Sequence, residues 1–196
     1  MAPKQKHRQP VIDSAVTLFR RHGYSATGLN DIVELSQAPK GSLYHYFPGG
    51  KSSIAVAAVD EAGRRVCETL SELANESSTT SDLLKAHVVL LIKWMKRSGF
   101  KDGCPITTVL LELSPDDRAV TIAGRQAYSD RIQILCDKLV GDGFSEQRAS
   151  QLASVCTSAI QGALIQARVQ RSGKPLSIAA EQLAQMLSDT VKTESD

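Results

Sequence analysis

Aromatic residues and cysteines are scarce in this 196-residue sequence, and their scarcity limits what the protein can be. Aromatics make up 5% of the residues, so the hydrophobic fraction of 42% consists mainly of small and aliphatic side chains. The four cysteines are scattered without a CxxC pair, at positions 67, 104, 136 and 156. This spacing does not support a zinc site, and we expect reduced thiols and no bound metal.

Long apolar runs and catalytic signatures are also missing. No apolar stretch reaches the roughly 18 residues that a membrane-spanning helix needs. The basic start of the chain, MAPKQKHRQP, leads into no apolar signal segment, so we expect a cytoplasmic protein without a membrane partner. Neither a GxSxG motif nor a metal-binding signature occurs, and no nucleophile stands out with a base. We therefore expect neither an enzyme nor a cofactor.

Positive charge is concentrated near the N-terminus. The formal net charge is only +2, yet residues 1–51 contain seven Lys or Arg against three acidic residues. The remaining 145 residues contain 16 basic and 18 acidic residues. A basic segment on a slightly acidic body indicates an anionic partner for that segment.

Helical periodicity runs through the sequence, and no segment alternates convincingly with a period of two. Apolar residues at helical spacing, interrupted by glycine, proline and serine, predict an all-α fold of about nine helices. We expect a three-helix head in residues 1–50, and a connecting helix with a larger bundle in 51–196. The sequence Ser114-Pro115-Asp116-Asp117 predicts the start of the seventh helix, with the serine as its cap.

Residues 11–47 predict a helix-turn-helix arrangement. The first helix ends at Gly23, Thr27 is a suitable N-cap for the second, and PKGSLYHYF (39–47) predicts a short third helix. Leu43 and Phe47 are four residues apart, so both can point into a small core that we expect to include Phe19, Ile32 and Val33.

The other side chains of the short helix suit DNA. Lysine and serine can bond base edges, tyrosine hydroxyls contact phosphates, and glycine lets the backbone approach closely. A threonine at a helix N-terminus and a lysine opening the fourth helix can reach further phosphates. The predicted residues for binding double-stranded DNA are Thr27, Lys40, Gly41, Ser42, Tyr44, His45 and Lys51.

The segment GYSATGLNDIVELSQAPKGSLYHYFPGGKSSI resembles the DNA-binding signature of the TetR family of transcriptional regulators. The resemblance lies in the pair Gly23-Tyr24, in Thr27, in the G-x-L-Y-x-x-F pattern of residues 41–47 and in Lys51. Its dense part covers about 30 residues, and the predicted helix count extends it loosely over the chain.

Two features depart from the common TetR pattern. Pro39 stands where a serine is common, and the loop PGGK has one additional residue. Together with Gly103-Cys104-Pro105, they resemble the branch of lincomycin-resistance-type repressors. The resemblance implies a homodimer that reads a palindromic operator, and a small-molecule effector that binds in the C-terminal bundle and changes the spacing of the heads.

The body therefore needs a dimer surface and a pocket. The last two predicted helices carry small and apolar residues that suit a four-helix interface between two copies. The predicted dimerisation residues are Ala153, Ile160, Ala163, Leu164, Leu183 and Leu187. The predicted ligand-binding residues are Trp94, Met95, Phe100, Ile106, Leu110, Tyr128 and Cys156. Few charges fall among them, so we expect an uncharged or aromatic effector.

Some alternatives stay open at this point. Cys104, at a predicted helix N-terminus, could be the reactive thiol of a redox-responsive regulator. An activator or a nucleoid protein would carry the same head as a repressor. His87 lies on a mostly apolar helix, and we interpret it as a core residue rather than a catalytic base.

Overall fold

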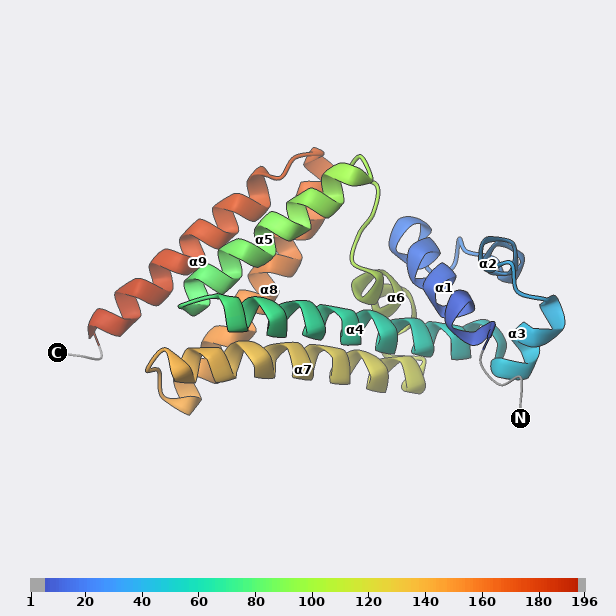
Figure 1. Ribbon diagram of the computed structural model, residues 1–196, viewed down its shortest axis with the longest axis horizontal. Helices are drawn as coiled ribbons and strands as arrows, with labels where there is room; N and C mark the ends of the chain where they lie inside the picture. The colour runs from blue at the N-terminus through green and yellow to red at the C-terminus, as the bar shows by residue number, and fades with distance from the viewer. Residues whose placement is uncertain (1–5, 194–196) are drawn as a thin grey trace. The chain divides into compact units, whose positions relative to one another are not determined.

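The computed structural model describes residues 6–193, with side chains described as far as residue 188. This part of the chain forms nine α-helices and no strand, which confirms the predicted all-α class (Figure 1). The helices are α1 (Arg8–His22), α2 (Leu29–Ser36), α3 (Lys40–Tyr46), α4 (Gly50–Glu76), α5 (Thr80–Arg97), α6 (Pro105–Leu113), α7 (Arg118–Gly141), α8 (Glu146–Gln170) and α9 (Lys174–Thr193).

The start of the seventh helix lies later than the sequence predicts. Ser114 is the C-cap of α6, and α7 begins only after Asp117. The Asp117 carboxylate accepts hydrogen bonds from the N–H groups of Ala119 and Val120, both at 3.0 Å. Asp117 therefore satisfies the first-turn donors that the sequence pattern assigns to the serine.

The chain divides into two compact units. One comprises Met1–Arg64 with Cys104–Ala127, and the other comprises Arg65–Gly103 with Tyr128–Asp196. The helices α4 and α7 therefore contribute to both units. By packing, the start of α4, the whole of α6 and the start of α7 belong with the three-helix head. The border at residue 50 between DNA binding and ligand binding stays a prediction about function.

In the first unit, α1 packs against α2, α3 and α6. Phe19 and Ile32 are fully buried, Leu43 is 1% exposed and Phe47 is 3% exposed, as their spacing predicts. Val33 is only half-buried, so it contributes less to this core than expected. The short helix α3, which could not fold alone, is held in place by its two buried anchors.

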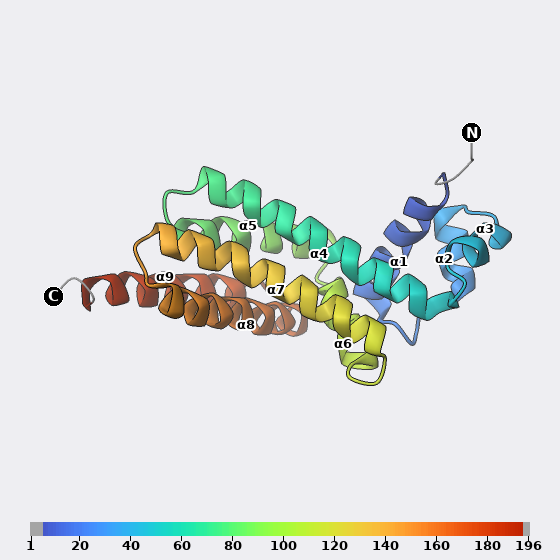
Figure 2. The ribbon, with the colours of Figure 1, turned by 90° about the horizontal axis from the view of Figure 1, so that it is seen from below.

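In the second unit, α5 packs along α9, and α8 packs against both (Figures 1 and 2). The turn between α4 and α5 is fixed to the end of α7. Lys138 Nζ donates hydrogen bonds to the carbonyls of Ser77 and Ser78, at 2.8 and 3.2 Å, and Asp142 accepts one from the Thr80 N–H at 2.6 Å. None of the described helices has an apolar stretch long enough to cross a membrane.

Candidate nucleic-acid interface

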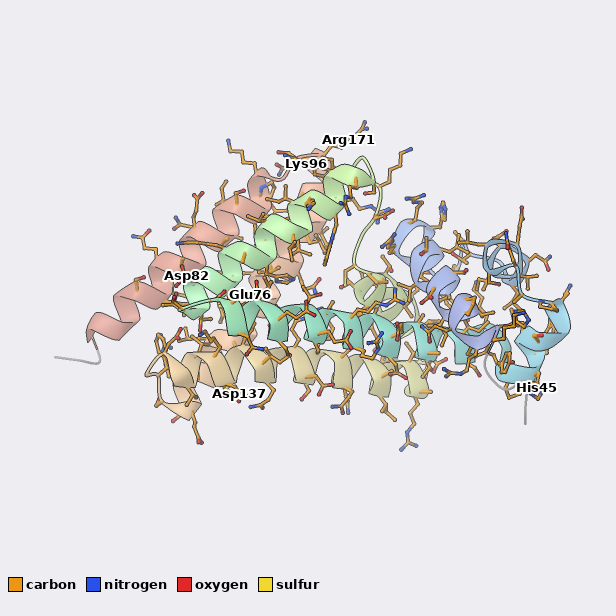
Figure 3. All side chains as sticks on the ribbon, viewed as in Figure 1. His45, Glu76, Asp82, Lys96, Asp137 and Arg171 are labelled. Atoms are coloured by element: carbon orange, nitrogen blue, oxygen red, sulfur yellow. The ribbon has the colours of Figure 1, made fainter. Side chains whose placement is uncertain are left out.

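The outer side of α3 carries the predicted DNA-binding residues. Lys40, Gly41, Tyr44 and His45 are all exposed, with Tyr44 at 51%, whereas Ser42 is half-buried. Figure 3 shows His45 on α3. The exposed residues share the helix with the buried Leu43, so anchoring and display are divided between its two sides.

The turn before α3 has a fixed conformation. Gln37 adopts a left-handed conformation with φ of 53°, and the Ser36 hydroxyl accepts a hydrogen bond from the Ala38 N–H at 3.3 Å. Ala38 is 4% exposed and packs into the core. These contacts determine where α3 begins relative to α2.

Thr27 is not the N-cap of α2, which corrects the sequence interpretation. Gly28 occupies that position, and its N–H donates to the Asp31 carboxylate at 2.7 Å. The Thr27 side chain is 1% exposed, and its hydroxyl donates to the Gly23 carbonyl at 2.7 Å. The hydroxyl closes the loop between α1 and α2, and a phosphate contact by Thr27 stays a prediction.

Lys51 lies in a cluster that the sequence does not reveal. Its Nζ is 4.2 Å from the centroid of the Tyr24 ring and donates to the Ser25 carbonyl at 3.4 Å. Partial burial lowers the pKa of Lys51, although the carboxylates of Glu112 and Asp31 act in the opposite direction. The lysine is half-buried in this conformation, so a phosphate would compete with Tyr24 and Ser25 for it.

Glu112 of α6 binds the loop that follows α1. Its carboxylate accepts hydrogen bonds from the N–H groups of Tyr24 and Ser25, at 2.7 and 2.6 Å. Partial burial raises the pKa of the Glu112 carboxyl, but the hydrogen bonds from Ser25 and Tyr24 and the charge of Lys51 outweigh it, and the pKa is lowered. The ionised carboxylate is therefore the favoured form.

A second contact joins the start of α4 to the start of α7. The Ser52 hydroxyl donates to the Asp117 carboxylate at 2.6 Å. This bond, with the N–H groups of Val120 and Ala119, lowers the pKa of Asp117. No local sequence pattern identifies Glu112 or Asp117 as partners of the head, because each contact joins residues more than 60 positions apart.

The predicted ligand-binding residues are divided between the two units. Ile106 and Leu110 belong to the first unit, and the other five belong to the second. Trp94 is 44% exposed, whereas Met95 is buried. Cys156 is fully buried and lines an internal cavity, and its burial raises the pKa of the thiol to about 11. Their common role as a ligand site stays a prediction.

The predicted dimerisation residues all lie inside a single chain. Each of the six is at most 9% exposed, namely Ala153, Ile160, Ala163, Leu164, Leu183 and Leu187. The exposed apolar residues of the same helices include Val155, Ile165, Val169 and Ile178. A partner would meet these exposed residues first.

Cys104 is the half-buried N-cap residue of α6. Its carbonyl accepts hydrogen bonds from the N–H and the hydroxyl of Thr108, at 3.0 and 3.1 Å. This geometry accounts for its place at the helix start without any redox role.

An α3 helix that is anchored on one side and exposes lysine, tyrosine and histidine on the other defines a DNA-binding helix-turn-helix protein. Residues 11–58 match the bacterial regulatory proteins of the tetR family. Residues 80–182 match the C-terminal domain of LmrA/YxaF-like transcriptional regulators. The chain therefore belongs to the TetR family of DNA-binding transcriptional regulators.

Relatives cover nearly the whole chain. An uncharacterised HTH-type transcriptional regulator of Mycobacterium tuberculosis is 36% identical over 188 residues, which cover 93% of this chain and 95% of that protein. The uncharacterised HTH-type transcriptional regulator YxaF of Bacillus subtilis is 30% identical, covering 93% of this chain and 96% of its own.

Solved structures share the fold. A TetR transcriptional regulator from Legionella pneumophila has a TM-score of 0.82 at 18% identity, covering 94% of this chain and 99% of its own. The regulator CifR, solved as a cysteine mutant with 26-bp operator DNA, has a TM-score of 0.76 at 17% identity, covering 94% of this chain and 98% of its own.

Proposed function

We propose that this protein is a homodimeric repressor that binds a palindromic operator through its two α3 helices. A small effector bound in the C-terminal domain releases it from the DNA. The exposed side of α3 is the observation that carries this proposal, because Lys40, Tyr44 and His45 face outward beside the buried Leu43. A recognition helix reads base edges in the major groove with such outward side chains.

A second copy of the chain is the proposed partner of α8 and α9. These helices leave apolar side chains in water, with Ile165 at 51%, Val169 at 78% and Ile178 at 47% exposure. Ile178 also lines an open hollow of about 540 Å³, together with the small or amide residues Ala159, Gly162 and Gln182. Small residues let helices approach closely, and a two-fold dimer would match a two-fold operator.

Effector release would act through the contacts between the head and α6. The bonds from Glu112 to the loop after α1, and from Asp117 to Ser52, support this route because they would transmit a movement of α6 or of the start of α7. The operator would favour one spacing of the heads and the effector another. A coupling free energy of about 1–3 kcal/mol gives roughly 5- to 150-fold release.

Selection from random double-stranded DNA with the purified protein tests this function. We expect an enriched motif with two-fold symmetry, and sedimentation of the complex should give two chains per symmetric site. Enrichment of an asymmetric motif, or of none, would contradict the proposal.

A matched pair of variants tests the dimer surface. Val169→Glu places a charge at the proposed interface and should raise the dimer dissociation constant about 100-fold, corresponding to about 3 kcal/mol. Val89→Glu changes a valine of α5 that is 64% exposed, and should remain dimeric. Equal dimerisation of the two variants would show that the interface lies elsewhere.

A further inference from the structure

The second unit encloses a small cavity between α4, α5, α7 and α8. Five lining side chains are apolar, namely Leu70, Leu84, Leu135, Cys156 and Ile160. The other three are the polar residues His87, Arg131 and Thr157. The cavity has a volume of about 10 Å³, roughly the space that one water molecule needs.

Arg131 brings a buried positive charge to this cavity. The residue is 6% exposed, and its Nε has no hydrogen-bond partner. Its guanidinium carbon lies 5.5 Å from the centroid of the Tyr128 ring, and no carboxylate in the described part of the chain forms an ion pair with it. Arginine stays charged in proteins, and a buried charge without a partner destabilises a fold. The cavity therefore favours an anion.

The neighbouring polar groups are also incompletely satisfied or uncharged. Thr157 is 5% exposed, and its hydroxyl has no partner. His87 is 8% exposed, and burial, together with the charge of Arg131, lowers its pKa to about 4. The imidazole is therefore neutral near pH 7. Arg131 is the one charged group among the eight lining residues, so the cavity matches a ligand with a single negative charge.

We infer that this cavity anchors a small organic anion, in which an oxyanion binds Arg131 and Thr157 and an apolar body lies among the leucines. This inference names the chemical class of the effector and thus rests on the proposed function. The oxyanion is a carboxylate or an ionised phenol, because both present oxygen acceptors to a guanidinium. It replaces our expectation of an uncharged effector.

The size of the cavity connects binding to a change of conformation. A volume of about 10 Å³ does not hold an organic acid, so the leucine side chains must move apart as the ligand enters. The ligand would then favour a widened arrangement of α4, α5, α7 and α8 over the closed one described here. Such differential binding is what effector release requires.

Thermal unfolding of the full-length protein with matched compounds tests the inference. The probes are benzoate and butyrate as carboxylates, 4-nitrophenol as an ionised phenol, and benzamide and butyramide as neutral isosteres. We expect at least one anion at millimolar concentration to raise the melting temperature, while its neutral isostere does not. The carboxylate and phenol arms show which oxyanion the site takes.

Variants of α7 assign the effect to the cavity. Arg131→Met removes the charge at similar length and should weaken anion binding at least tenfold, while raising the melting temperature of the unliganded protein. Arg131→Lys should retain part of the binding. Arg125→Met removes an exposed arginine from the same helix and should bind the anions as the wild type does.

Several outcomes would overturn the inference. Equal stabilisation by the amides, equal anion binding by Arg131→Met, or no shift with any anion would each leave the cavity as a site for one buried water. Operator binding without ligand is measured separately. A protein that binds a symmetric operator but ignores the anions retains its proposed function and loses only this effector class.

Discussion

Glu112 of α6 accepts a hydrogen bond of 2.7 Å from the backbone N–H of Tyr24, which lies 88 residues earlier in the chain. Its other oxygen accepts one from the Ser25 N–H at 2.6 Å. One side chain thereby fixes the loop that leads from α1 into α2, and with it the position of the recognition helix.

Glu112→Ala should lower both operator affinity and stability. The carboxylate is exposed, so we expect a decrease of only about 1 kcal/mol in the free energy of unfolding, despite two charge-assisted bonds. Glu112→Gln keeps one carbonyl acceptor and should be destabilised less. Urea unfolding and operator titration measure the two effects. Asp116→Ala removes an exposed carboxylate just after α6 and serves as the control; an equal effect there would mean that only net charge matters.

Gly23→Ala should destabilise the head for two separable reasons. Gly23 has φ of 85° and ψ of 176°, a region that is essentially restricted to glycine, and a Cβ there would collide with the Glu112 carboxylate. We expect a decrease of about 1–3 kcal/mol in the free energy of unfolding. Gly141→Ala, where nothing lies within 4 Å of the added Cβ, should be neutral or slightly stabilising.

A double-mutant cycle separates the two causes. In a chain that already carries Glu112→Ala, the collision is absent and only the backbone strain remains, so Gly23→Ala should cost less than in the wild type. Urea unfolding of the four proteins measures the difference. Equal decreases in both backgrounds would show that the carboxylate moves aside freely and that the conformation of Gly23 alone accounts for the effect.

His87 should make the protein less stable in mild acid. Its pKa is lowered from an ordinary value of 6.5 to about 4, so between these values the unfolded state binds more protons than the folded state. Stability is therefore lost as the pH falls from about 6.5 to about 4, by an amount on the order of 3 kcal/mol.

The variant His87→Gln isolates this contribution. Its free energy of unfolding, followed by urea unfolding across the same pH range, should fall less steeply than that of the wild type. His45→Gln removes an exposed histidine and should follow the wild-type curve. Parallel curves for His87→Gln and the wild type would mean that His87 is protonated equally in the folded and unfolded states.

Local spacing was sufficient to predict the helices and the anchors of α3. Leu43 and Phe47 are buried as their separation of four residues requires, and α6 begins at Pro105 and ends at Leu113, where the sequence places it. The errors at Thr27 and Ser114 arise because each has a neighbour that caps its helix instead. Capping patterns identify candidate residues, and tertiary contacts select among them.

The contacts of Glu112 and the burial of Arg131 could not be predicted in this way. Glu112 meets Tyr24 only because α6 packs against α1, and the sequence contains no pattern that reports this pairing. Arg131 lies on a helix with many polar residues, so its burial is not evident from periodicity. Both depend on the packing of elements that lie far apart in the chain.

Lys51→Ala should weaken binding to all DNA sequences alike. For each phosphate that the protein no longer neutralises, the slope of log K against log salt should become shallower by about 1, or by about 2 for two heads. Titration of operator DNA at several salt concentrations measures the slope, with the exposed Lys85→Ala as control. A lower affinity with an unchanged slope would mean that Lys51 only supports Tyr24 and binds no phosphate.

Lys40→Ala should relax base preference in addition to lowering affinity. Lys40 is exposed at the start of α3, where its ammonium group can donate to the acceptors of a guanine edge. Without it, the free-energy penalty for one mismatched base pair at that position should shrink by about 1–3 kcal/mol. Parallel titrations of operator DNA and of singly mismatched DNA measure this penalty. Unchanged discrimination by Lys40→Ala would assign base reading to other residues of α3.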